Sequence, residues 1–112
     1  MLTNSLREAP PYPVEQALRK LGSNLRTARV RRGITIGEAA AKIGTGPRLV
    51  ADAEHGKPQI GIAVYTALLW LYDLLGPLEE LADPQKDEQG LILASRHEPR
   101  RAHKSRGLSN DF

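Results

Sequence analysis

The chain has 112 residues, of which 40% are hydrophobic and 4% aromatic, and its formal net charge is +3. This length favours one domain with tails, and the scarcity of aromatic residues favours a small helical core of Leu, Ile, Val and Ala over a β-sandwich. Because a core of this size leaves a monomer marginally stable, we expect dimerisation. The chain has no cysteine, which excludes disulfides and thiolate metal sites and is compatible with a reducing cytosol.

Charge is distributed unevenly along the chain. Residues 1–32 hold seven Arg or Lys against two acids, residues 33–95 hold four against nine, and residues 96–112 hold five against two. Basic ends around an acidic middle fit a surface for a polyanion and a separate surface for another partner, although ordinary solvated faces give the same pattern. The N-terminus lacks the apolar segment of a signal peptide, and residues 60–75 are too short and interrupted to span a bilayer. We therefore expect a cytoplasmic, nucleoid-associated protein with no membrane contact.

The first 12 residues contain Pro10 and Pro11 and show little periodicity, so we expect a flexible lead. From Pro13 onward, apolar residues recur at spacings of three and four, which predicts one long helix to about Arg32. Gly22 inside this pattern weakens the helix by about 1 kcal/mol relative to alanine, so a break near it is an alternative.

A short helix is predicted after Gly33. Thr35 and Glu38 have the spacing of a capping box, in which each residue's side chain accepts from the backbone amide of the other. The helix runs to about Ile43, and Gly44 is suited to the left-handed cap that ends it.

A second short helix follows after a sharp turn. Pro47 suits its first position, and the helix runs to His55 and ends at Gly56. A helix, a tight turn and a second short helix are typical of proteins that place the second helix in the major groove of DNA.

The C-terminal half continues the helical pattern. We expect a fourth helix over residues 62–75 and a short fifth helix over residues 77–82. The expected core face of the fourth helix comprises Val64, Ala67, Leu68, Leu71 and Leu75. The apolar run 91–94 is either a strand, which would pair across a dimer, or a helical turn. Residues 83–95 are therefore a candidate segment for dimerisation or partner binding, and residues 96–112 are expected to form a mobile basic tail.

The segment from Leu21 to about Leu81 resembles the Xre/Cro/lambda-repressor type of helix-turn-helix domain. The resemblance implies an all-α, five-helix bundle over residues 13–82 with flexible termini. The positions that agree in register are Leu25, Arg29, Gly33, Thr35, Glu38, Ala39, Ile43, Gly44, Val50, Glu54 and Gly56.

The resemblance makes the second short helix the recognition helix. Arg48 would read a base, since its guanidinium matches the O6 and N7 acceptors of guanine. Asp52 would accept from cytosine N4 or orient Arg48 through an i,i+4 pair, and both roles stay open. Small residues at the remaining positions leave more of the readout to DNA shape. The expected base-contacting residues are Gly46, Pro47, Arg48, Ala51 and Asp52.

Further roles follow from the same resemblance. Phosphate contacts are expected from Thr45, Arg26, Lys57 and Gln59 and from backbone amides at Ile36, whose side chain stands where the family commonly has glutamine. Arg29 and Glu54 correspond to a buried ion pair of the family. The expected dimer surface comprises Trp70, Leu74, Leu78 and Leu81, with core packing as the alternative for Trp70.

A second resemblance concerns residues 81–101. Leu81-Ala82-Asp83-Pro84, Asp87-Glu88-Gln89-Gly90-Leu91, Arg96 and Pro99-Arg100-Arg101 are similar to small HipB-like regulators. This implies a dimeric autorepressor on a palindromic operator that also serves as the antitoxin of a HipA-like kinase toxin. The alternative is a stand-alone phage-type or metabolic Xre-family repressor.

Neither reading requires an enzyme, a cofactor or a metal. His55, His97 and His103 are too dispersed to suggest a ligand set, and the chain contains no phosphate-binding glycine loop or nucleophile elbow.

Overall fold

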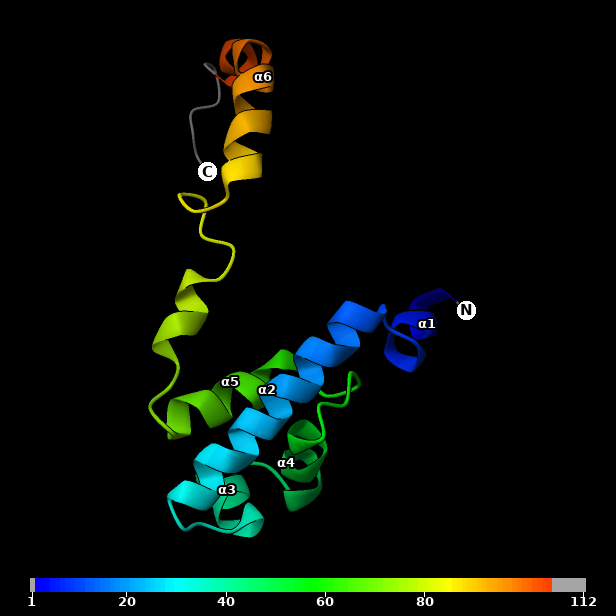
Figure 1. Ribbon diagram of the computed structural model, residues 1–112, viewed down its shortest axis with the longest axis vertical. Coiled ribbons are helices and arrows are strands. Elements are labelled where there is room, and N and C mark those ends of the chain that lie inside the picture. Colours follow the sequence, from blue (N-terminus) through cyan, green and yellow to red (C-terminus); the bar gives the residue numbers. More distant parts are fainter. Residues whose placement is uncertain (1, 106–112) are drawn as a thin grey trace. The chain divides into compact units, whose positions relative to one another are not determined.

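The computed structural model describes residues 2–105 and the side chains of residues 5–97. Within that part of the chain the structure has helices and no strand, which confirms the all-α class. Contacts within the chain divide it into two units after Gly76, whereas boundaries after residues 12, 82 and 95 were expected from the sequence. The elements in Figure 1 are α1 (Leu2–Glu8), α2 (Tyr12–Arg31), α3 (Ile36–Ile43), α4 (Pro47–Glu54), α5 (Ile62–Leu71), the 3-10 helix η1 (Gly76–Glu80) and α6 (Glu88–Ser105).

Helix α2 is continuous through Gly22, so the predicted alternative of a break there is wrong. Gly22 is buried where α2 meets the C-terminal end of α4. A Cβ atom at this position would lie 2.6 Å from the carbonyl oxygen of Glu54, closer than atoms can pack. The glycine therefore permits the close approach of two helices and does not mark a weak point.

The turn between α3 and α4 is built as its sequence predicts. The Thr35 hydroxyl accepts from the Glu38 amide at 3.0 Å, and the Glu38 carboxylate accepts from the Thr35 amide at 2.8 Å. Gly44 adopts the left-handed conformation with φ of 81°, and Pro47 occupies the first turn of α4. These caps satisfy backbone groups that the ends of short helices would otherwise leave unpaired.

The core lies in the first unit, where α4 packs against α2, α3 and α5. Alanines at the centre of this packing let the short helices approach closely. Its buried hydrophobic residues are Leu25, Ala28, Ala39, Ala40, Val50, Ala53, Tyr65, Leu68 and Tyr72.

The inward face of α5 contains the predicted positions and adds two tyrosines to them. Leu68 is fully buried, and the other predicted positions are half-buried. Tyr65 in α5 and Tyr72, which caps the helix, are buried about one turn before and after Leu68. The Tyr65 hydroxyl donates to the Lys57 carbonyl at 3.0 Å, which allows a polar ring tip to face inward. The spacing of apolar residues predicted a core face of aliphatic side chains and did not indicate that tyrosines would be buried.

Three element boundaries correct the expectations. Residues 2–8 are helical where a lead without regular structure was expected. Helix α5 ends at Leu71 instead of Leu75, because Tyr72 caps it and Asp73 takes a φ of 60°. The expected fifth α-helix is the 3-10 helix η1.

The second unit contains the largest difference. Residues 91–94 are helical, and α6 continues to Ser105 through most of the expected tail. Asp87 caps this helix, since its carboxylate accepts from the Gly90 amide at 3.0 Å. That capping signal was present in the sequence. The remainder of the expected tail, residues 106–112, lies outside the described residues.

Candidate nucleic-acid interface

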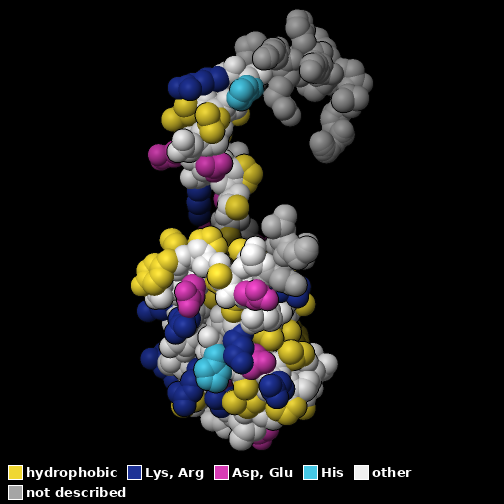
Figure 2. Space-filling model, turned by 90° about the vertical axis from the view of Figure 1, so that its right-hand side faces the viewer, with side chains coloured by type: hydrophobic (Ala, Val, Ile, Leu, Met, Phe, Trp, Pro, Cys, Tyr) yellow, Lys and Arg dark blue, Asp and Glu magenta, His cyan; other side chains and the backbone are white. Residues whose placement is uncertain are grey.

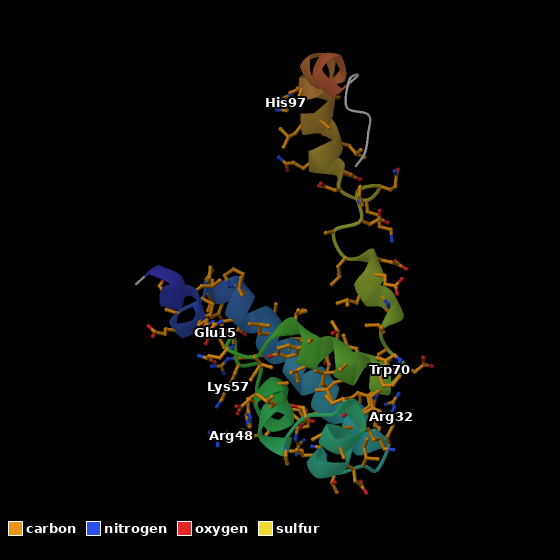
Figure 3. The ribbon with its side chains drawn as sticks, turned by 180° about the vertical axis from the view of Figure 1, so that it is seen from behind. Glu15, Arg32, Arg48, Lys57, Trp70 and His97 are labelled. Atoms are coloured by element: carbon orange, nitrogen blue, oxygen red, sulfur yellow. The ribbon has the colours of Figure 1, made fainter. Side chains whose placement is uncertain are left out.

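Helix α4 has one buried side and one exposed side. Val50, Ala53 and Glu54 are buried against the core, which fixes the rotation of the helix about its axis. Arg48, in the first turn, projects outward with 86% of its side chain exposed (Figure 3). We call the set Gly46, Pro47, Arg48, Ala51 and Asp52 the outer face of α4.

Asp52 lies between two cations on this face. Its carboxylate is 3.8 Å from Nε of Arg48 and 3.2 Å from Nζ of Lys57. This geometry matches the orienting role that the sequence left open for Asp52, and it extends that role to Lys57. A carboxylate held by two bases keeps both positive groups on the same side of α4.

The other residues of the outer face present small surfaces. Gly46 and Pro47 are exposed at the start of α4, and Ala51 is half-buried. Gly46 precedes the helix in an extended conformation and caps it without a side chain. Arg48 is therefore the one long basic side chain on this face.

The predicted phosphate-contacting residues lie in different surroundings. Arg26 and Lys57 are exposed, whereas Thr45 is half-buried in the turn and the Ile36 side chain packs against the core. The Ile36 amide lies at the start of α3, where the capping box already uses the Glu38 amide. Gln59 is exposed, but its side-chain amide donates to the carbonyl oxygen of a residue in α1, Arg7, at 3.2 Å.

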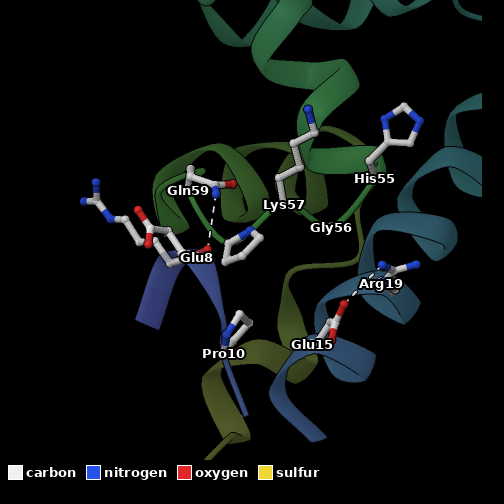
Figure 4. A pocket seen from close by; sticks show the side chains of 10 residues that line it. Glu8, Pro10, Glu15, Arg19, His55, Gly56, Lys57 and Gln59 are labelled. Atoms are coloured by element: carbon white, nitrogen blue, oxygen red, sulfur yellow. Dashed lines mark hydrogen bonds and ion pairs between the residues drawn. The ribbon is translucent and has the colours of Figure 1, made fainter. Parts of the chain in front are cut away.

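Beside Lys57 lies an open cavity of about 540 Å³, which is lined by residues of α1, of α2 and of the segment after α4 (Figure 4). Arg7, Arg19, His55 and Lys57 line it together with two carboxylates. One of these, Glu15, pairs with Arg19 at 3.1 Å. Figure 2 shows Lys and Arg side chains gathered around a histidine on this side of the first unit. Sequence reasoning did not assign Arg7 or Arg19 to this surface, although the i,i+4 spacing of Glu15 and Arg19 was visible.

Arg29 and Glu54 form the expected ion pair between α2 and α4. Nε and Nη2 of Arg29 donate to the two carboxylate oxygens at 2.7 and 3.0 Å, and Nη1 donates to the Ile34 carbonyl at 3.0 Å. Only 4% of the Glu54 side chain is exposed. The hydrogen bonds that Arg29 donates to the Glu54 carboxylate raise the pKa of Arg29 above its ordinary value. The pair thus ties α4 to α2 and to the loop that leads into α3.

Comparisons of the chain with protein-family models, with curated proteins and with solved structures found no match. The geometry of the outer face and the sequence resemblance are therefore the basis for a functional proposal.

A second arginine, Arg32, plays a role that the sequence did not reveal. Its guanidinium donates to the carbonyl oxygens of Ala28 and Tyr72 at 2.9 Å each. It also lies 5.5 Å from the centre of the Tyr72 ring, within the range of a cation–π contact. Arg32 therefore holds the ends of α2 and α5 together.

The residues expected at a dimer surface are mostly accessible. Trp70 is 62% exposed, which rules out the alternative that it packs in the core. Leu74 and Leu81 are also exposed, whereas Leu78 is half-buried. Figure 3 shows Trp70 at the C-terminal end of α5.

The described part of the chain has neither a cluster of metal-binding side chains nor a membrane-spanning helix. Residues 5–97, whose side chains the structure describes, contain no group of three or more His, Cys, Asp or Glu side chains placed to hold a metal ion. No helix in the same part of the chain has the length and hydrophobicity needed to cross a membrane.

Proposed function

We propose that the protein is a sequence-specific regulator that binds double-stranded DNA and places α4 in the major groove. The observation that carries this proposal is the two-sided character of α4. Its inner side is held by the core and by the Arg29–Glu54 pair, while its first turn presents Arg48 to solvent. Helix-turn-helix proteins read bases with residues from the first turn of such a helix.

The charges around α4 support the same proposal. Lys57 lies beside Asp52 after the helix, and Arg7 and Arg19 line the neighbouring cavity. Basic side chains that flank a recognition helix neutralise phosphates and set the register of the protein on the duplex. Arg48 would supply the base contact, and Lys57 would supply a phosphate contact.

The proposed regulator acts as a homodimer on a palindromic operator. Two recognition helices about 34 Å apart would enter successive major grooves on one side of the duplex. A dimer that covers its own promoter would repress the operon that encodes it.

A second proposal concerns the antitoxin role implied by the HipB-like resemblance. The candidate surfaces are the acidic segment 73–88, in which Asp73, Glu79 and Asp87 are exposed, and the basic tail. Such an acidic segment suits a partner with a basic surface, and a HipA-like kinase toxin is the partner that the resemblance implies. Co-purification with the product of an adjacent gene would support this role, and failure to co-purify would favour the stand-alone repressor.

The main proposal is tested by fluorescence anisotropy with DNA from the region upstream of the gene. Arg48→Ala should cost about 1–3 kcal/mol of binding free energy on the preferred site and relax the preference at one base pair. Lys57→Ala should weaken binding to all sequences and reduce the slope of log K against log salt by about one.

Lys20→Ala is the matched control. Lys20 is exposed on α2, on the side opposite to Gly22, which contacts α4. This variant should bind DNA like the wild type. Absence of binding at low salt and micromolar protein would overturn the proposal, and an equal loss on all sequences for Arg48→Ala would make Arg48 a phosphate contact.

A further inference from the structure

Helix α6 exposes a short apolar segment. Leu91, Ile92 and Leu93 are 50%, 56% and 44% exposed, and they follow directly after the capped first turn of the helix. In proteins, most of the stability of a helix comes from the packing of its apolar surface and less from helix propensity. Burial of these exposed side chains against a partner surface would therefore stabilise α6.

The charges around this segment are complementary to those of the same segment running in the opposite direction. Residues 88–96 read Glu-Gln-Gly-Leu-Ile-Leu-Ala-Ser-Arg, so an acid and a base lie at equal distances on either side of Ile92. On a helix, Glu88, Ile92 and Arg96 are four residues apart and share one face. All three side chains are exposed.

We infer that α6 pairs with α6 of a second copy of this chain, antiparallel, with the two-fold axis at Ile92. The two Ile92 side chains then pack at the centre. Leu91 and Leu93 lie about 100° to either side of Ile92 around the helix, so they border this contact on its two flanks. Each Glu88 lies within reach of Arg96 of the partner subunit, so the dimer contains this ion pair twice. The partner is a second copy because one chain supplies both halves of the charge pattern.

Charge also selects the direction of pairing. A parallel pair in register would set Glu88 beside Glu88 and Arg96 beside Arg96, and like charges at these distances repel. The antiparallel pair replaces both repulsions with attractions. Such an isologous contact closes at two copies, because each surface is used once on each subunit.

The inference is tested on the full chain without DNA, by sedimentation equilibrium, so its outcome is independent of DNA binding. Glu88→Arg and Arg96→Glu should each raise the dimer dissociation constant at least about tenfold, since each replaces two attractions with two repulsions. An equimolar mixture of these two variants should dimerise like the wild type, because every acid again faces a base.

Matched controls carry the same charge changes outside α6. Glu8→Arg and Lys20→Glu, at exposed positions of the first unit, should leave the dissociation constant unchanged. Circular dichroism checks that the variants keep their helix content. Because the chain has no cysteine, a mixture of Glu88→Cys and Arg96→Cys proteins can report direction. Disulfides between the two variants should exceed those of either variant with itself.

Four results would overturn the inference. These are a monomeric wild type at high micromolar concentration, single charge variants that dimerise like the wild type, a mixture that stays monomeric, and cysteine variants that crosslink mainly to themselves. A wild type that is monomeric would leave the α6 surface to a different protein. Single variants that remain dimeric would shift the interface elsewhere, such as to Trp70.

Discussion

At the scale of single residues, the Arg29–Glu54 pair shows how a buried charge orients a helix. Glu54 is almost fully enclosed and accepts two hydrogen bonds from one guanidinium, while the third donor group of Arg29 reaches the Ile34 carbonyl. The bidentate geometry permits one relative angle between α2 and α4. Such a pair therefore contributes more to fixing how the two helices are arranged than to the net free energy of unfolding.

Removal of one partner should therefore be far more costly than removal of both. Arg29→Met leaves Glu54 without its cation and should lower the free energy of unfolding by about 3–5 kcal/mol. The double variant Arg29→Met, Glu54→Leu should recover most of this loss. Urea denaturation measures both, with Arg19→Met as a control for an exposed pair that should cost less than about 1 kcal/mol.

The two buried tyrosines of the core should respond differently to loss of their hydroxyls. The Tyr65 hydroxyl donates to the Lys57 carbonyl, so Tyr65→Phe should cost about 1 kcal/mol. The Tyr72 hydroxyl is buried and has no hydrogen-bond partner within the described residues, so Tyr72→Phe should be neutral or stabilising. A loss at Tyr72 as large as the loss at Tyr65 in the same urea experiment would show that its hydroxyl is satisfied in solution.

At the scale of elements, small residues determine how closely the helices approach one another. Gly22 touches the carbonyl groups that end α4, and Gly56, with φ of 70°, lies against the backbone of α2 at Leu18. Both glycines bring α4 and its following loop onto α2. The position of Arg48 thus depends on two glycines, one 26 residues before it and one 8 residues after it.

Two glycine-to-alanine variants separate helix propensity from packing. Gly22→Ala should destabilise the protein even though alanine favours a helix by about 1 kcal/mol, because its Cβ would collide with backbone that cannot move alone. Gly37→Ala in α3 should stabilise by up to about 1 kcal/mol, since the nearest atom to its Cβ lies 3.9 Å away. Thermal unfolding of both variants tests this, and a stabilising Gly22→Ala would mean that α2 and α4 are further apart.

At the scale of the whole molecule, the core is small and its largest fully buried side chain is a tyrosine. Burial raises the pKa of both Tyr65 and Tyr72 above the ordinary value of 10.0, and the nearby carboxylates of Asp52 and Glu54 act in the same direction. The folded state therefore holds these protons more tightly than the unfolded state does.

Alkaline pH should consequently weaken the fold. The contribution of the two tyrosines is fully present below pH 10 and is lost as the pH rises above it, because the unfolded chain ionises first. The free energy of unfolding measured by urea at pH 8 to 11 should fall, and Tyr72→Phe should reduce that fall. A Tyr72→Phe variant with the same pH dependence as the wild type would exclude Tyr72 as a source.

The local features of the candidate site were predictable from residues close together in the sequence. Thr35 and Glu38 predict a capping box, Gly44 predicts a left-handed helix cap, and Pro47 predicts the start of a helix. Each of these features depends on residues no more than three or four positions apart. Asp87 could likewise have predicted the start of α6, but the apolar run 91–94 was compatible with a strand as well as with a helical turn. The hydrogen bond of Gln59 could not be predicted in this way, because its acceptor, the Arg7 carbonyl, lies 52 residues earlier in α1.

By itself, the sequence determined the helical class, the α3–turn–α4 unit and the outward position of Arg48, since periodicity and caps are properties of neighbouring residues. Only the tertiary structure decided that Tyr65 and Tyr72 are buried, that Gly22 contacts the end of α4 and that Asp52 lies between two cations. These features depend on which surfaces meet, and that depends on the fit and hydrogen bonding of side chains distant along the chain.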